Sequence, residues 1–164
     1  MELLIVRHAI AEDRRPGLRD EDRKLTAKGK KRFQRHVAAL GQLGLAPTVI
    51  LHSPWRRAVQ TAELVAAIGK ASLQVEAGLA QGPDEALLAA LAAFEGPDAR
   101  PMVIGHQPWL SELAGWLVWG RAQGADERLR LKKGGAVLLE GVLSPGAMRL
   151  AALLPPRVLR SIAS

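Results

Sequence analysis

The sequence contains no cysteine. This absence excludes disulfide bonds, thiolate catalysis and zinc sites built on cysteine ligands. Long apolar runs are absent too, since the longest one, residues 86–94, is about half the length of a membrane span. Near the N-terminus only four apolar residues separate Glu2 from Arg7, which is not typical of a secretory signal. We therefore expect a cytoplasmic protein with a single domain over residues 1–164, long enough to form its own core.

Acidic and aromatic residues are scarce beside the basic ones. The net charge is +7, and residues 12–35 alone contain ten Lys or Arg against five Asp or Glu. A second basic cluster comprises Arg128, Arg130, Lys132 and Lys133. Such charge attracts acidic partners such as phosphoproteins, phosphorylated metabolites or nucleic acid. Because Phe33 is the only aromatic residue in either cluster, stacking platforms for nucleic acid are missing, and none is expected as a partner. Whether the basic segment 12–35 docks a protein or only keeps the domain soluble stays open.

Short apolar runs alternate four times with helical patterns. Strands are expected at residues 3–6, 48–51, 73–76 and 102–104, and helices at 26–44, 53–68, 84–96 and 108–119. Residues 121–134 resemble a basic loop, residues 136–142 and 148–154 a hairpin, and the tail after 154 shows no clear element. This order predicts an α/β protein, a three-layer α/β/α sandwich with a mainly parallel central sheet.

Polar side chains follow three of the expected strands. Arg7 and His8 follow the first, Ser53 and Arg57 the second, and His106 the fourth. The carboxyl ends of parallel strands meet at one edge of a sheet, where ligands bind in open α/β folds. We therefore expect these side chains to converge on one site.

Helical periodicity favours Arg57 over Arg56 as the residue that reaches this site. Arg57 lies beside the apolar positions of its helix, whereas Arg56 shares a polar stripe with Gln60 and should be solvated. Ser53 is expected to cap the helix, with Pro54 in the first turn, so that free N–H groups face an anion. Two arginines, two histidines and a helix N-terminus suit a phosphoryl group, and the cations lower the pKa of a histidine among them.

These residues resemble the histidine phosphatase superfamily, also called the phosphoglycerate-mutase-like fold. The resemblance rests on residues 6–9, 53–62 and 104–106, and on residues 20–23 and 25–29, which look like the family's stretch before its first helix. The three catalytic blocks in this order and spacing are specific together. The resemblance covers roughly residues 1–120, and the final hairpin matches loosely.

The short chain without a cap insertion resembles the SixA branch, whose members remove phosphate from histidine on phosphotransfer domains. This resemblance implies that His8 becomes phosphorylated while Arg7, Arg57 and His106 hold the phosphoryl group, with Ser53 as a further substrate-binding residue. It implies a metal-independent phosphatase without a cofactor that acts on a phosphorylated protein or a small phosphorylated substrate. Ala9 replaces the family's usual glycine, a small change that still allows close packing.

The family's general-acid glutamate has no clear counterpart in the loop at residues 77–85. A general acid contributes about 10²–10⁴-fold when an alkoxide leaves, whereas the imidazole of phosphohistidine is less basic and departs with less help. Asp84 or Glu85 is a candidate for a displaced acid, although Asp at a helix start is more typical of a cap. The residues thus favour a phosphohistidine phosphatase. The alternatives are a broad small-molecule phosphomonoesterase or mutase, and a non-catalytic phosphate- or nucleic-acid-binding module.

The remaining histidines and tryptophans suggest no second site. His36 is predicted to lie on the surface of its helix and His52 to pack in the interior. The four histidines lack the spacing of metal ligands, so no metal site is expected. Trp55 and Trp109 each begin a helix beside the rim and are candidates for shaping the mouth of the pocket.

Overall fold

A six-stranded sheet forms the centre of the computed structural model, which describes residues 1–67, 71–96 and 98–163. The strands lie in the order β3-β2-β4-β1-β5-β6. Their bounds are β1 (Glu2–Arg7), β2 (Val49–His52), β3 (Ser72–Val75), β4 (Pro101–Gly105), β5 (Ala136–Gly141) and β6 (Met148–Leu154). Strands β1 to β4 are parallel, while β5 runs antiparallel to β1, and β6 antiparallel to β5. The predicted parallel sheet with a late hairpin is confirmed.

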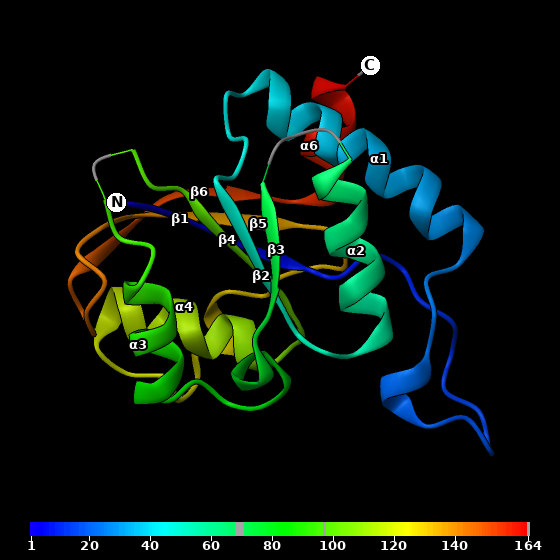
Figure 1. The fold of residues 1–164 in the computed structure, drawn as a ribbon, viewed down its shortest axis with the longest axis horizontal. Coiled ribbons are helices and arrows are strands. Elements are labelled where there is room, and N and C mark those ends of the chain that lie inside the picture. Colours follow the sequence, from blue (N-terminus) through cyan, green and yellow to red (C-terminus); the bar gives the residue numbers. More distant parts are fainter. Residues whose placement is uncertain (68–70, 97, 164) are drawn as a thin grey trace.

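Helices cover both faces of the sheet (Figure 1). One face carries α1 (Ala27–Gln42), α2 (Arg56–Ala66) and α6 (Pro156–Ile162), and the other carries α3 (Glu85–Ala92) and α4 (Trp109–Trp119). A short helix, α5 (Ala125–Arg128), packs against α4, and single turns of 3₁₀ helix occur at Asp20–Asp22 and Ala77–Ala80. The three-layer α/β/α sandwich is confirmed.

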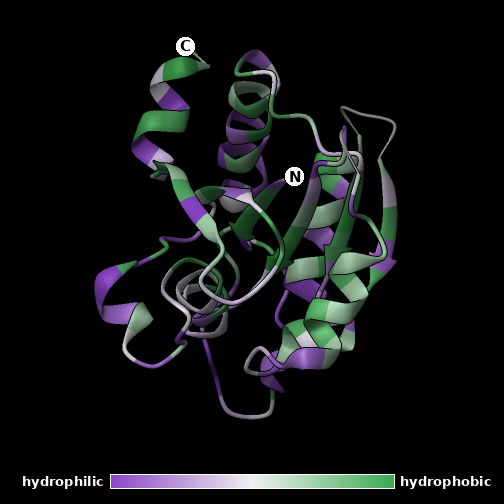
Figure 2. Cartoon of the chain, turned by 90° about the vertical axis from the view of Figure 1, so that its left-hand side faces the viewer, coloured by the Kyte–Doolittle hydropathy of each residue, from purple (hydrophilic) through white to green (hydrophobic). Residues whose placement is uncertain are grey.

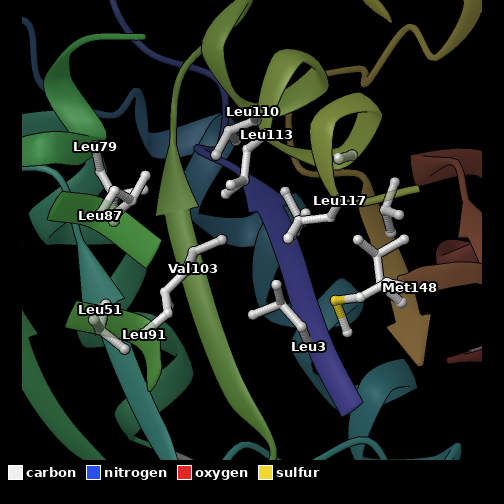
Figure 3. Packing of buried hydrophobic residues seen from close by; sticks show 14 of the residues in the cluster. Leu3, Leu51, Leu79, Leu87, Leu91, Val103, Leu110, Leu113, Leu117 and Met148 are labelled. Carbon is white, nitrogen blue, oxygen red and sulfur yellow. The ribbon is translucent and has the colours of Figure 1, made fainter. Parts of the chain in front are cut away.

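The strands divide their apolar side chains between the two helical layers. Leu3 and Ile5 of β1 belong to the cluster under α3 and α4, whereas Leu4 and Val6 belong to the cluster under α1, α2 and α6. This follows from the two-residue period of a strand, and it explains why a strand buried on both faces is apolar throughout. Figure 3 shows Leu3 beside the α4 side chains of this first cluster. All four side chains have no exposed surface, which makes β1 a rigid support for the residues at its end.

The second helix, the third helix and the basic loop differ from the expected elements. The second helix begins at Arg56 rather than at Ser53, and it ends at Ala66, whereas the expected end at 68 lies outside the described residues. The third helix ends at Ala92 rather than near residue 96. The basic loop at 121–134 contains the short helix α5, because Gly124 and the residues after it form one helical turn.

The C-terminal tail, which showed no clear element in the sequence, forms α6. Pro156 stands in the first turn of this helix, a position that suits proline, and Leu159 packs into the core beneath α1. Figure 2 shows that α6 carries hydrophobic residues beside hydrophilic ones, as expected for a surface helix. Among the described residues, no helix is both long enough and apolar enough to cross a membrane.

Candidate active site

Four side chains from three strand ends meet at the carboxyl edge of the parallel strands. Arg7 ends β1 and His8 follows it, Arg57 lies in the first turn of α2, and His106 follows β4. The ring centroids of His8 and His106 are 5.2 Å apart, and Nε of Arg57 donates to Nε2 of His8 at 3.1 Å. We call these four residues the catalytic rim. The structure thus brings together the residues that the strand order predicted to converge.

The imidazole of His8 is held with one nitrogen ready to react. Its Nδ1 donates to the carbonyl oxygen of Ala9 at 2.7 Å, so Nε2 carries no proton and accepts from Arg57. Burial lowers the pKa of His8 to about 2, and the charges of His106, Arg57 and Arg7 add to this effect. The ring is therefore neutral at physiological pH, with a free electron pair on Nε2, as a nucleophile requires.

His106 presents a hydrogen-bond donor next to His8. The hydroxyl of Ser53 accepts from the backbone N–H of Trp55 at 3.3 Å and lies 2.9 Å from Nε2 of His106, and we assign the proton of this second bond to the hydroxyl. Nδ1 of His106 then carries the ring proton, and this buried atom has no hydrogen-bond partner among the described residues. Burial lowers the pKa of His106 to about 3, with Arg57 as the next cause, so the ring is a neutral donor. Ser53 is fully buried and acts on His106, so the expectation that it caps the helix was wrong.

Arg7 is held by the segment that precedes β5. One terminal nitrogen of its guanidinium donates to the carbonyl oxygen of Leu131 at 2.9 Å, while its Nε is buried without a partner among the described residues. The backbone N–H of Gly134 reaches the carbonyl oxygens of both Arg7 and His8, at 3.0 and 3.1 Å. Because β5 runs against β1, its beginning lies at the same edge as the end of β1. The late part of the chain therefore completes the rim.

Two buried nitrogens in the rim, Nε of Arg7 and the Nδ1 of His106 to which we assign the ring proton, lack a hydrogen-bond partner among the described residues. Buried polar groups are nearly always paired, so such a pair beside an unprotonated imidazole needs an explanation. The oxygens of a phosphoryl group on Nε2 of His8 would accept from donors of this kind. This is the observation that connects the rim to phosphate chemistry.

Asp20 is a site residue whose role the sequence reasoning missed. Its carboxylate accepts from the guanidinium of Arg57 at 2.9 Å and from that of Arg23 at 2.6 Å, and it forms a third ion pair with Arg14 at 3.0 Å. Although burial opposes the change, hydrogen bonds from Arg23 and Arg57 hold the pKa of Asp20 well below its usual range. Asp20 is therefore charged at neutral pH, and its ion pair fixes the fork of Arg57 while Nε points at His8. The only sequence signal was its place in the stretch before the first helix.

Two tryptophans form a wall over the rim, as the helix starts suggested. The ring of Trp55 lies 4.4 Å from that of His106, and the guanidinium carbon of Arg57 lies 4.6 Å from the Trp55 ring. Trp109 meets both Trp55 and His106 edge to face, at 5.8 and 6.1 Å. The Trp55 ring also makes a cation–π contact with Arg57, which favours the charged guanidinium in the rim.

The two candidates for a displaced general acid stand at the start of α3. Asp84 caps α3, because its side chain accepts from the backbone N–H of Leu87 at 2.8 Å, and Glu85 is an exposed residue of the same first turn. Ala9, which stands where the family usually has glycine, is buried and donates its N–H to Thr61 at 3.1 Å. Within the described ranges, no group of three or more His, Asp or Glu side chains is placed to hold a metal ion.

His36 contradicts the prediction of a surface residue. It is 3% exposed, its Nδ1 lies 2.9 Å from the carbonyl oxygen of Gly134, and its ring packs against Phe33. Burial lowers its pKa, so the ring is neutral and donates from Nδ1. The signal was present in the sequence, because position 36 falls on the same stripe as Phe33, Val37 and Leu40. His52 is buried, as predicted.

An unprotonated histidine between two arginines at this edge of an α/β sheet defines an enzyme of phosphoryl transfer that works through histidine. The family model of the histidine phosphatase superfamily (branch 1) matches residues 3–82, and the chain belongs to this superfamily. A protein of Picosynechococcus sp. that is described as uncharacterized is 43% identical over 156 residues, which cover 93% of this chain and 90% of that protein.

Two solved structures show the shared fold. The protein histidine phosphatase SixA complexed with tungstate superposes with a TM-score of 0.80 at 24% identity, over 97% of this chain and 99% of that one. A mycobacterial glucosyl-3-phosphoglycerate phosphatase superposes with a TM-score of 0.71 at 20% identity, over 94% of this chain and 98% of that one. The fold therefore serves phosphatases of different substrates, and the side chains of this chain must indicate which substrate it takes.

Proposed function

We propose that this phosphatase hydrolyses phosphohistidine on a protein through a covalent intermediate at His8, without a metal ion or cofactor. The superfamily supports a phosphatase that acts through histidine. The observation that carries the finer proposal is the neutral imidazole of His8. Its Nε2 carries no proton and lies beside the charged donors of Arg7 and Arg57 and the neutral donor of His106.

The reaction proceeds in two displacements. Nε2 of His8 attacks phosphorus, a new N–P bond forms, and the N–P bond to the substrate imidazole breaks with its electron pair on that imidazole. Water then attacks the phosphorus of phosphorylated His8, which releases inorganic phosphate and returns the free imidazole. Arg7 and Arg57 neutralise the charge on the transferred oxygens and His106 donates from Nδ1, so the rim binds the trigonal transition state more tightly than the resting phosphate.

The carboxylates near the rim are not placed to protonate a leaving group, which favours a substrate whose leaving group departs without that help. Among the described residues, the carboxylate that contacts the rim is Asp20, and its ion pairs keep it charged and unable to donate a proton. Asp84 is engaged as a helix cap. An alkoxide that leaves without a proton forfeits the help that a general acid gives, whereas the imidazole of phosphohistidine leaves as a neutral molecule when its second ring nitrogen carries a proton. This argument selects phosphohistidine over phosphate esters.

The test compares a phosphohistidine peptide with glycerol phosphate, each in the presence and absence of a chelator. We expect kcat/KM for the peptide to exceed that for the ester by about 10²-fold or more, because only the ester needs the missing acid. Chelator should leave both rates unchanged. Equal rates for the two substrates would support the broad phosphomonoesterase instead.

The covalent step is tested by trapping the intermediate. Brief incubation with the phosphohistidine peptide should label the protein with phosphate that is stable in alkali and lost in acid. His8→Ala should abolish this label, whereas His52→Ala, at a buried histidine outside the rim, should retain it. Label that persists in His8→Ala would contradict the proposal.

A further inference from the structure

A basic groove lies beside the catalytic rim. A cavity of about 870 Å³ opens between α1, α6 and the segment before β5, and Arg7 of the rim forms part of its lining. The other cations that line it come from all three elements: Arg32 from α1, Arg130, Lys132 and Lys133 from the segment before β5, and Arg157 and Arg160 from α6. We call this cavity with its lining residues the basic groove.

Several cations of the basic groove carry unneutralised charge. Arg32, Arg130, Lys132 and Arg157 are exposed, and none of them forms an ion pair within the described part of the chain. Among the described residues, no Asp or Glu lines the groove. Burial lowers the pKa of Lys133, and the charges of Arg7, Arg23 and Arg57 lower it further, while the charge of Asp13 opposes them. An anionic partner would relieve this excess of positive charge.

The lining of the basic groove also contains apolar residues. These are Ile10, Leu153, Leu154, Pro155 and Pro156 among others, and Leu153 is 44% exposed. The aromatic residue in its lining, Phe33, is 1% exposed and offers no face on which a base could stack. A single-stranded polynucleotide binds through cations together with exposed aromatic rings, whereas an acidic polypeptide can bind through cations together with apolar side chains. The groove therefore matches a segment of protein that carries both carboxylates and apolar side chains.

We propose that the basic groove docks an acidic, partly apolar segment of the phosphorylated protein that the enzyme acts on. This inference rests on the proposed function, because it places the phosphohistidine of the same partner at His8. Arg7 belongs to both the rim and the groove, so a partner seated in the groove presents its chain next to the nucleophile. The exposed cations attract the partner, and the apolar residues of the lining contact one or two of its side chains.

The experiment uses two phosphohistidine peptides, one flanked by Glu and Leu and the other by Gln and Leu, with phosphoramidate as the small reference substrate. In the double variant Arg32→Glu/Arg157→Glu, kcat/KM for the acidic peptide relative to phosphoramidate should fall about tenfold or more at low salt. The Gln peptide should show a much smaller change. A matched control is Arg35→Glu/Arg121→Glu, which makes the same change in net charge at exposed positions outside the groove lining. It should leave the ratio within about twofold.

The outcomes separate this proposal from the proposed function. An equal fall in both double variants, or no fall in the groove variant, overturns the docking site. If the wild type hydrolyses neither peptide, the proposed function fails. Binding of the unphosphorylated acidic peptide to the wild type, but not to the groove variant, then still supports the groove. A single-stranded oligonucleotide that binds the groove more tightly than the acidic peptide overturns the proposal in favour of nucleic acid.

Discussion

The arginines of the catalytic rim and of the basic groove lie in adjoining regions but are held in opposite ways. Arg57 is 4% exposed, and its nitrogens contact His8 and Asp20 while its carbon lies over Trp55. Arg32 and Arg157 are exposed, and no ion pair of theirs occurs within the described part of the chain. Arginine thus provides a fixed hydrogen-bond geometry in the catalytic rim and a long-range attraction in the basic groove. Phosphoryl transfer requires the fixed geometry, whereas recognition of a variable partner requires only the attraction.

Replacing arginine by lysine should separate the two regions most clearly. Arg57→Lys keeps the charge but loses the planar fork that bridges Asp20 and His8, so we expect kcat to fall by about 10²–10³-fold. Arg32→Lys keeps the charge in a region where charge alone matters, and kcat/KM for the acidic peptide should change by less than about twofold. Steady-state kinetics on phosphoramidate and on the acidic peptide would measure both effects. Similar losses in the two variants would remove the distinction between the regions.

Lowering the pH should destabilise both regions, the rim more than the groove. The pKa values of His8 and His106 in the rim and of His36 in the groove all lie below the ordinary value for histidine. Below pH about 6.5 the unfolded chain takes up protons that the folded chain refuses, so stability is present above this pH and is lost as the pH falls. Between pH 6.5 and 5 each of the two rim histidines should cost about 2 kcal/mol.

Urea unfolding at pH 7 and pH 5 measures this loss. His106→Gln should reduce the difference in the free energy of unfolding between pH 7 and pH 5 by about the contribution of one histidine. His36→Gln measures the contribution of the histidine in the basic groove in the same way. The carboxylate of Asp20 acts in a separate window, because its lowered pKa keeps its contribution until the pH falls below about 4. Equal stability at pH 7 and pH 5 would contradict the neutral state of these rings.

Ser53→Ala should give the smallest effect and test how the rim prepares its donor. Without the hydroxyl, Nε2 of His106 loses the partner that leaves the proton on Nδ1, and kcat should fall about tenfold with little change in KM. Nitrogen NMR shifts of His106 report which ring nitrogen is protonated. A fall in kcat with unchanged shifts would show that Ser53 acts on packing rather than on the proton.

The sheet and the rim could be predicted because their causes are local. Each buried strand is a short apolar run, and the parallel order brings its last residue to one edge. Arg57 could be chosen over Arg56 because the two fall on different faces of one helix, and the structure buries the first and exposes the second. The burial of His36 also had a local signal, because position 36 lies on the apolar stripe of its helix. The polarity of histidine nevertheless led to the prediction of a surface residue.

Asp20 could not be found in this way. It lies 37 residues before Arg57, and no periodicity of its own segment turns its carboxylate toward the rim. The same holds for the basic groove, because α1, the segment before β5 and α6 meet only after the hairpin has reversed the chain. Helix α6 itself could have been predicted, since Pro156 is a regular helix start, but its position over α1 could not.

Gly134 ties the two regions to a single residue. Its N–H holds the ends of β1 at Arg7 and His8, while its carbonyl oxygen accepts from His36 on the wall of the basic groove. Its φ of +77° is unfavourable for other residues, and a Cβ atom there would stand 2.8 Å from Nδ1 of His36. A methyl group at this one position would shift the nucleophile and the partner-facing surface together. Catalytic rate and partner choice in this enzyme are therefore not free to change independently at residue 134.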